Sequence, residues 1–427
     1  MKYKKYETPA YNIHLIKTDK FKTISVKINF KKLFKKEDIT FRNMLINVLL
    51  ESTIDYPKRR LLEIKTEELY NFSYSSGTYN SGEYTIMSFN CSFLHEKYTE
   101  MGMNEKSLQF FFDFLLRPNV NNNEFESSGF KNAYNILKED ITSFEDNYSR
   151  YSNARLYEEM GKNEKISYRS VGYLEDLDKI TPKDLYEYYQ STLKSDLIDI
   201  FIIGDIDDTQ IKNIILENFT IKTAKKASKE HFINHKKFKN RVTKVKEKKK
   251  INQSYLCMGF KVEPLTTFEK EYVGSIYSYI LGGGADSKLF KNVREKNSLC
   301  YSISSSFSSI ISTMSISAGI NADSFNKTVK LIREEVKKME KGEFDELDIE
   351  KAKITYVASF KQLLDAPFAI INLYVAHQYM GYDLLEERVK NILKVNRDMI
   401  LKVAKKIHPD TIFLLEGGKE NEKDTSL

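Results

Sequence analysis

The sequence predicts an α+β fold that occurs twice along the chain, each time as an antiparallel or mixed sheet covered by helices. Period-two alternation occurs in paired stretches around short turns, which is typical of strands that form hairpins. Stretches with apolar residues three and four apart lie between these strands and predict helices. The same order of elements begins again after residue 250, with five landmarks repeated at offsets of about 210–230 residues. Hairpin strands with helices between them favour an α+β sandwich over a parallel sheet.

The first half of the chain predicts a sheet with a buried helix near its start. Residues 37–50 are expected to form that helix because their apolar residues recur three and four apart. Asn80, Ser81 and Gly82 are turn residues, and Pro182 suits a first helical turn. In order, the expected elements are strands at 11–16 and 21–30 joined as a hairpin around Asp19, the helix at 37–50, a helix after Pro57, strands at 72–79 and 84–94, helices at 105–116, from 123 into the 150s and at 181–193, and an apolar strand at 197–203.

The second half repeats this order around a glycine-rich stretch. In order, we expect a strand at 251–260, a helix at 266–281, a glycine loop, a short helix at 287–296, strands at 299–307 and 313–320, a long helix that opens near 343, a helix at 398–407 and a strand at 411–415. The proposed domain limits are therefore 1–220 and 251–427, with 221–250 between them.

Residues 281–307, LGGGADSKLFKNVREKNSLCYSISSSF, are the most informative stretch. Gly282, Gly283 and Gly284 suit a turn or a flexible loop, because glycine costs stability inside a helix or strand. The helical spacing of Leu289, Phe290 and Val293 predicts one apolar face on the short helix. Alternation then predicts a strand with Tyr301 on the same side as Ile303. Beside such a loop, the side chains of Arg294 and Tyr301 could donate hydrogen bonds to the carbonyls of an extended peptide or to the oxyanion that develops during its cleavage. On residue types alone, the favoured reading is a surface ion pair for Arg294 and an ordinary strand aromatic for Tyr301.

This stretch resembles the C-terminal half of the insulinase-like (pitrilysin, M16) zinc peptidases, in which such a segment carries an Arg and a Tyr that bind substrate. The resemblance implies two homologous α+β halves that enclose a chamber, and it shifts Arg294 and Tyr301 towards substrate binding. It is strong around 281–307 and rests on pattern elsewhere.

Active members of that family carry His-x-x-Glu-His on a helix of the N-terminal half, where two imidazoles bind zinc and the Glu activates water. The corresponding stretch here reads FRNMLINVLLES, and the chain has no histidine between His14 and His95. Glu51 alone cannot hold zinc. His231 and His235 lie one helical turn apart but lack a third ligand and the family context. We therefore expect no catalytic residue and no metal site in this chain.

The composition is that of an ordinary globular protein, with 41% hydrophobic and 30% charged residues and a net charge of +7. No apolar run approaches the roughly 18 residues of a membrane span, and the start of the chain has no signal-peptide core, so we expect a cytoplasmic protein. Three well-separated cysteines suit buried, reduced thiols.

The segment at 221–250 is rich in lysine with little apolar periodicity. A nucleic-acid-binding arm is one interpretation. The position midway along the chain and the scarcity of aromatic residues favour a solvated inter-domain linker instead.

The resemblance and the missing motif lead to two hypotheses. In the first, the chain is a non-catalytic subunit of a heterodimeric M16-type peptidase whose partner, a paralogue with the zinc motif, holds the metal. In the second, it is an inert structural or peptide-holding scaffold without a role in hydrolysis. The substrate, the partner's identity and self-association stay open.

Overall fold

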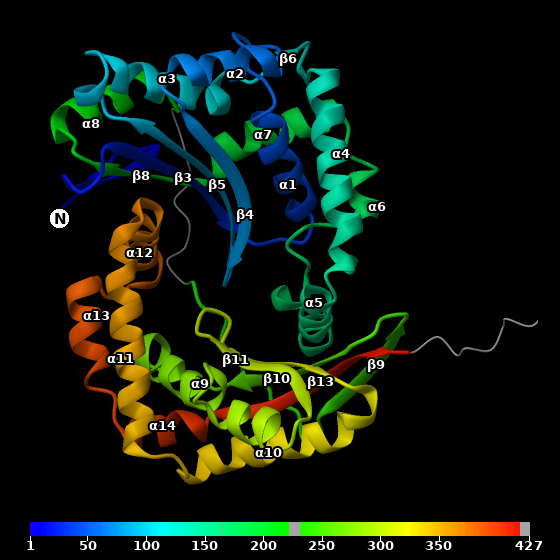
Figure 1. Ribbon diagram of the computed structural model, residues 1–427. Coiled ribbons are helices and arrows are strands. Elements are labelled where there is room, and N and C mark those ends of the chain that lie inside the picture. The colour runs from blue at the N-terminus through cyan, green and yellow to red at the C-terminus, as the bar shows by residue number, and fades with distance from the viewer. Residues whose placement is uncertain (163, 222–230, 419–427) are drawn as a thin grey trace, which may run out of the picture. The chain divides into compact units, whose positions relative to one another are not determined.

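In the computed structural model, which describes residues 1–162, 164–221 and 231–418, the chain forms two compact units (Figure 1). The first contains the described residues of Met1–Ser143, Arg169–Glu230 and Leu364–Val375, and the second contains those of Phe144–Tyr168, His231–Leu363 and Ala376–Leu427. Each unit is a sheet with helices packed on it, which confirms the predicted α+β class and its duplication.

The first unit contains a six-stranded mixed sheet. Its strands are β1 (Lys2–Glu7), β2 (Tyr11–Lys17), β3 (Thr23–Leu33), β4 (Ser73–Ser81), β5 (Tyr84–Leu94) and β8 (Leu197–Gly204). Their order is β1-β2-β8-β3-β5-β4, and only β2 and β8 are parallel neighbours. The predicted hairpin around Asp19 is wrong, because β8 lies between β2 and β3. All residues of β8 except the first are buried, as is typical of a strand with a neighbour on either side.

Helices cover one face of this sheet. They are α1 (Asp38–Leu49), α2 (Arg59–Glu68), α3 (Met103–Leu116), α4 (Ser127–Ser143), α6 (Leu174–Leu177), α7 (Pro182–Ser195) and α8 (Asp208–Asn218). Fully buried side chains such as Met44 of α1, Phe111 of α3 and Ile200 of β8 form its core. The opposite face carries polar side chains, among them Lys27, whose Nζ donates to Asn372 Oδ1 at 2.7 Å. The amphipathic pattern therefore places α1 correctly against the sheet.

The second unit repeats the topology with one strand fewer. Its strands are β9 (Thr243–Lys249), β10 (Ser254–Val262), β11 (Cys300–Ser308), β12 (Thr313–Ile320) and β13 (Ile407–Gly417). Their order, β11-β12-β10-β13-β9, matches β4-β5-β3-β8-β2 of the first unit. The one parallel pair, β13 with β9, corresponds to β8 with β2. The duplication thus extends to strand order and direction, and β1 has no counterpart among the described strands of the second unit.

Helices cover one face of this second sheet as well. They are α9 (Gly274–Gly282), α10 (Phe325–Lys341), α11 (Glu346–Gln362), α13 (Leu385–Ile392) and α14 (Arg397–Ala404), and α12 (Pro367–Met380) runs from residues of the first unit into the second. A π-helical turn, Glu269–Val273, leads into α9. Ile276, Ile332 and Ile412 are fully or almost fully buried in the core that these elements share with the sheet. Within the described ranges, no helix is long and apolar enough to cross a bilayer.

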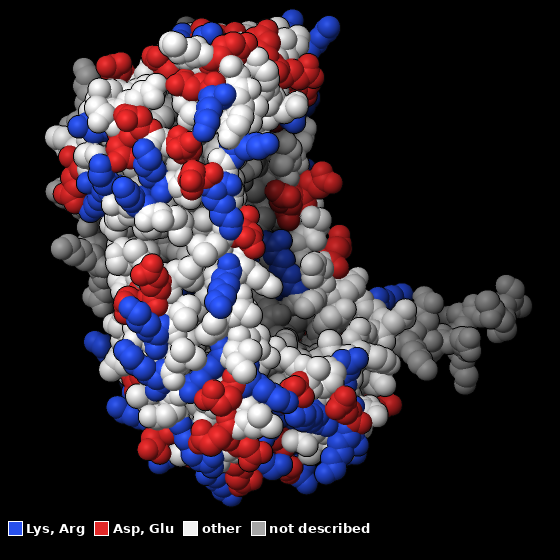
Figure 2. Space-filling view, turned by 60° about the vertical axis from the view of Figure 1, so that its left-hand side comes forward, with Lys and Arg blue, Asp and Glu red and all other residues white. Residues whose placement is uncertain are grey.

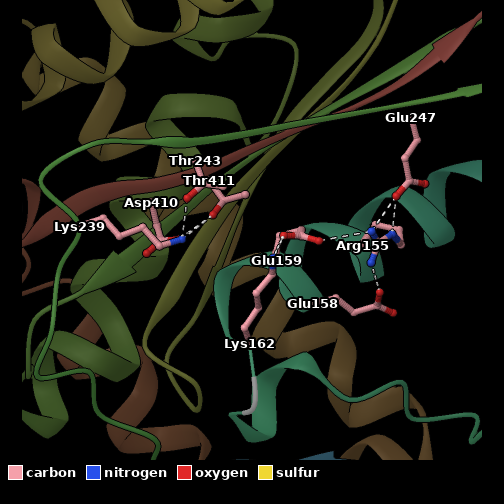
Figure 3. Close-up of polar contacts among 9 residues, drawn as sticks. All are labelled: Arg155, Glu158, Glu159, Lys162, Lys239, Thr243, Glu247, Asp410 and Thr411. Carbon is pink, nitrogen blue, oxygen red and sulfur yellow. Dashed lines mark hydrogen bonds and ion pairs between the residues drawn. The ribbon is translucent and has the colours of Figure 1, made fainter.

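The long helix expected from residue 123 into the 150s is interrupted. It divides into α4 and α5 (Tyr148–Met160), because Asn147 caps the second helix by accepting a hydrogen bond from the Arg150 backbone N–H at 3.0 Å. Although it comes from the first half of the sequence, α5 packs on the sheet of the second unit. Arg155 of α5 binds Glu247 of β9 through its Nε at 2.7 Å and also pairs with two glutamates of its own helix (Figure 3).

The basic segment at 221–250 was expected to be a solvated linker, but most of its described residues contact the second unit. Residues 222–230 lie outside the described residues. Beyond them, Lys239 Nζ lies 2.8 Å from Asp410 Oδ1 and 3.0 Å from Thr243 Oγ1, as Figure 3 shows, and 243–249 form β9. Period-two alternation predicts a strand in this stretch, Thr-Lys-Val-Lys-Glu-Lys-Lys, but its many charged residues hid the pattern.

Candidate functional site

Arg294 lies on a π-helical turn, Phe290–Glu295, within the predicted short helix. Leu289 and Val293 are fully buried and anchor the turn on the core, as their spacing predicted. The Arg294 side chain is exposed, and its guanidinium carbon lies 4.5 Å from the centre of the Phe290 ring. Among the described residues no carboxylate forms an ion pair with it, so the surface ion pair expected from residue types alone, with Glu295 or another acid, is not formed. Wide π turns of this kind recur at functional sites.

A tight turn connects this helix to β11. Ser298 has a φ of +50°, and its N–H donates to the Arg294 carbonyl at 2.9 Å. The Leu299 N–H donates to the Val293 carbonyl at 3.1 Å. The chain therefore reverses directly after Arg294 and brings the start of β11 back beside it.

Tyr301 is the extra residue of a β-bulge. Cys300 pairs with Ile320 and Ser302 with Gly319, so Tyr301 has no partner on β12. The prediction that Tyr301 shares a face with Ile303 is wrong, because the bulge breaks the alternation at this residue. Its side chain is 63% exposed, whereas that of Ile303 is buried. The Tyr301 hydroxyl donates to Asn321 Oδ1 at 3.3 Å, a contact that only the strand register could have revealed.

The thiol of Cys300 lies between these two side chains in sequence. Burial raises its pKa to about 11, and the nearby positive charge of Arg294 opposes that shift. The thiol is therefore protonated near neutral pH and is not a nucleophile.

The glycine run is packed at its start rather than flexible throughout. Gly282 is the buried last residue of α9, and a Cβ there would lie 2.6 Å from the Ser305 backbone nitrogen. Gly283 follows as the cap of the helix, and its N–H donates to the Tyr279 carbonyl at 2.8 Å. Gly284 accepts hydrogen bonds from the N–H and the hydroxyl of Ser287. The prediction of a turn thus fails at Gly282, where close packing against β11 requires glycine.

The helix expected to carry a zinc motif is α1, and its residues do not fit zinc. Its partly exposed residues one turn apart are Asn43 and Asn47, which are carboxamides rather than imidazoles. The Asn43 side chain is occupied: its Nδ2 donates to the carbonyls of Ile39 and Ser170, and its Oδ1 accepts from Thr78 at 2.6 Å. No zinc ligand set remains on this helix.

Other potential ligands are also engaged or isolated. Glu51 is buried, with its two oxygens 3.4 Å from Arg59 Nη1 and 3.3 Å from Asn132 Nδ2. His231 and His235 are buried rather than solvated, and His235 Nε2 contacts the Ile311 carbonyl at 2.9 Å. Burial, with the charge of Lys261, lowers the pKa of His235. Over the described ranges, no three His, Cys, Asp or Glu residues gather in a way that could hold a metal ion.

Comparison with known proteins identifies this architecture. Residues 179–356 match the family described as peptidase M16 inactive domain. A Bacillus subtilis protein described as a probable inactive metalloprotease, YmfF, is 30% identical over 408 residues, which cover 95% of either chain. An uncharacterized zinc protease of the same organism, YmxG, is 22% identical over 294 residues, 68% of this chain and 70% of that protein.

Solved structures share this fold. A conserved protein from Enterococcus faecalis has a TM-score of 0.92 and 25% identity, covering 98% of this chain and all of that one. A peptidase M16 inactive domain from Pseudomonas fluorescens has a TM-score of 0.79 at 14% identity, with 98% of both chains covered, and shows the shared fold. With its duplicated α+β units and its relative at 30% identity, the chain belongs to the peptidase M16 family, as a homologue of its inactive metalloproteases.

Proposed function

We propose that the chain is the non-catalytic subunit of a two-chain M16-type zinc peptidase. A paralogue with the His-x-x-Glu-His motif supplies the metal and the hydrolytic chemistry, and this chain supplies peptide contacts through Arg294 and Tyr301. The proposal is carried by the setting of these two side chains. Both are exposed at the junction of a π turn and a β-bulge, and Arg294 has no ion pair among the described residues.

Both groups are suited to bind peptide oxygens. The guanidinium presents several N–H donors in a fixed plane and the phenol presents one O–H. Either can donate to a substrate carbonyl or to the oxyanion of a tetrahedral intermediate, and loss of one such donor typically lowers kcat by roughly 10²–10³-fold. The exposed Gly284, where a Cβ would meet no atom closer than 3.6 Å, would let a peptide backbone approach closely. Gly282 and Gly283 instead act through packing, against Ser305 and Tyr279.

The assignment of the chemistry to a partner follows from α1. Its carboxamides cannot replace zinc-binding imidazoles, and Asn43 is already fully hydrogen-bonded. A cytoplasmic location is part of the proposal, supported by the free and buried state of Cys91, Cys257 and Cys300.

The test is co-expression with the zinc-motif paralogue from the same genome, followed by size exclusion, metal analysis and hydrolysis of a quenched fluorescent peptide library. We expect one zinc per pair and activity only in the pair. Arg294→Ala and Tyr301→Phe should each lower kcat at least tenfold with the complex intact. The matched controls are Arg60→Ala and Tyr98→Phe, exposed residues of the first unit, which should stay within twofold of wild type.

Two outcomes would count against this proposal in different ways. If turnover survives changes at both Arg294 and Tyr301, the site is wrong although the pairing stands. If the two chains do not associate, the chain acts instead as a structural or peptide-holding scaffold without a role in hydrolysis.

A further inference from the structure

We infer that the outer edge of β9, together with α10, binds an extended acidic polypeptide segment as an additional strand. This surface lies wholly within the second unit and contains neither Arg294 nor Tyr301. The inference therefore does not depend on the proposed peptidase role.

The two sheets differ at one edge. In the first unit, β1 pairs antiparallel with the outer edge of β2 from Lys2 to Glu7. In the second unit, β9 takes the place of β2, and the sheet ends there in the described part of the chain. The open edge of a strand presents backbone N–H and C=O groups that can pair with a further chain. An added strand would complete the six-stranded arrangement that the first unit already has.

A row of lysines marks this edge. Lys244, Lys246 and Lys248 alternate with less exposed residues and are the exposed side chains of β9. Lys244 and Lys246 pair with Ile412 and Leu414 of β13, both core residues, so the lysines are on the face covered by α10 rather than on the face that carries α5. Lysine at every second position matches the spacing of side chains on one face of a paired strand.

A basic stripe of α10 faces the same edge. Lys330, Arg333 and Lys337 are spaced by three and four residues and so lie on one side of the helix. With Lys244 they line a groove of about 370 Å³. Figure 2 shows many blue side chains, interspersed with red ones, along the lower edge of the view, the level at which α10 lies in Figure 1.

The groove has an excess of positive charge. Glu334 is the single acidic residue among its lining residues, 3.9 Å from Lys330. Lys244 and Arg333 form no ion pair with a described residue, so their charges are open to a ligand. In the first unit the added strand β1 is itself held by charge, since Lys4 Nζ lies 2.6 Å from Asp208 Oδ2 of α8. At β9, Lys246 and Lys248 already pair with Glu416 of β13, and Lys337 of α10 pairs with Glu340. The charge left for an incoming strand is that of Lys244 and Arg333, and it favours acidic side chains on that strand.

The lining favours a polypeptide over a nucleic acid. It consists of Lys, Arg, Asn, Val and Glu residues, without an aromatic ring on which a base could stack. The strand edge instead offers regularly spaced backbone groups, which are specific for another extended polypeptide.

The test uses fluorescence anisotropy on the full chain alone at 50 mM NaCl. The probe is a fluorescein-labelled ten-residue peptide of alternating Glu and Thr. The variant Lys244→Glu with Arg333→Glu should weaken binding about tenfold or more, since two attractive contacts become repulsive. The control is Arg60→Glu with Lys361→Glu, which changes net charge equally at exposed residues away from the groove and should stay within twofold.

Two further probes separate strand pairing from simple charge attraction. A peptide of alternating Glu and Pro keeps the charge but lacks half of the N–H donors, and it should bind at least tenfold more weakly. Fifteen-residue oligothymidylate should bind more weakly than the Glu-Thr peptide. Absence of peptide binding, equal loss in both variants, equal binding of the Glu-Pro peptide, or tighter binding of the oligonucleotide would each overturn the inference.

Discussion

Replacement of Gly282 by Ala should destabilise the protein, whereas replacement of Gly284 should not. A Cβ at Gly282 would lie 2.6 Å from the backbone nitrogen of Ser305 and 2.9 Å from its Oγ. At Gly284 the nearest atom would be the Tyr279 hydroxyl at 3.6 Å, an ordinary contact. The two glycines are two residues apart in one run, so each is a control for the other.

The magnitude follows from two opposing terms. Alanine in place of a helical glycine gains up to about 1 kcal/mol of helix propensity. Overpacking against a backbone atom costs about 1–3 kcal/mol. The backbone cannot rotate away as a flexible side chain would, and Ser305 is also held by its hydrogen bond to the Ser278 carbonyl at 2.6 Å. We expect Gly282→Ala to lower the free energy of unfolding by about 1–2 kcal/mol. Gly284→Ala should be neutral or stabilising by about 0.4–1 kcal/mol, because its φ is not positive.

The assay is urea unfolding followed by far-UV circular dichroism, with the three proteins compared at equal concentration. In the co-expressed pair, Gly282→Ala should also lower activity, since β11 must shift and Tyr301 moves with it. Equal stability of the two variants would refute the argument that α9 and β11 touch at Gly282.

Two further changes test the first unit. Arg42→Met should lower the free energy of unfolding, measured by calorimetry, by about 3–5 kcal/mol. Arg42 Nη2 lies 2.7 Å from Asp196 Oδ2 and both side chains are fully buried, so Asp196 would keep an uncompensated charge. Adding Asp196→Leu should restore part of the lost stability. Asp113→Asn should stabilise the protein at pH 7.5 and have little effect at pH 4, because burial is the main cause that raises the pKa of Asp113 to about 6. The side chain is partly exposed and solvent screens its charge, so we expect a gain of only about 1 kcal/mol at pH 7.5. Between about pH 4 and 6 the Asp113 carboxyl binds a proton in the native state but not in the unfolded state, so the contribution of Asp113 to wild-type stability falls as pH rises through this range. An equal stabilisation by Asp113→Asn at pH 4 and pH 7.5 would contradict this explanation.

The spacing of apolar residues in the sequence correctly predicted the elements whose position depends only on burying an apolar face. The apolar spacing of Met44 and Leu45 placed α1 in the core, and that of Leu289 and Val293 fixed the buried face before β11. Turn residues located the hairpin of β4 and β5 around Gly82. These features follow from local sequence because an apolar face of a helix or strand is stable only when it is buried in the core.

Features that depend on distant partners were not predictable. The insertion of β8 between β2 and β3 is decided by a strand about 180 residues away. The bulge at Tyr301 depends on its register with β12, and the need for glycine at residue 282 depends on the approach of Ser305. The strand β9 was hidden by its lysines, and the groove that Lys244 lines together with α10 is a feature of the folded chain alone.

The proposed role as a non-catalytic subunit is tested most sharply by the activity of the co-expressed pair with Arg294→Ala or Tyr301→Phe in this chain. We expect a complex with one zinc, a kcat at least tenfold below that of the wild-type pair, and unchanged association. A complex that cleaves peptides at the wild-type rate with both residues replaced would contradict it.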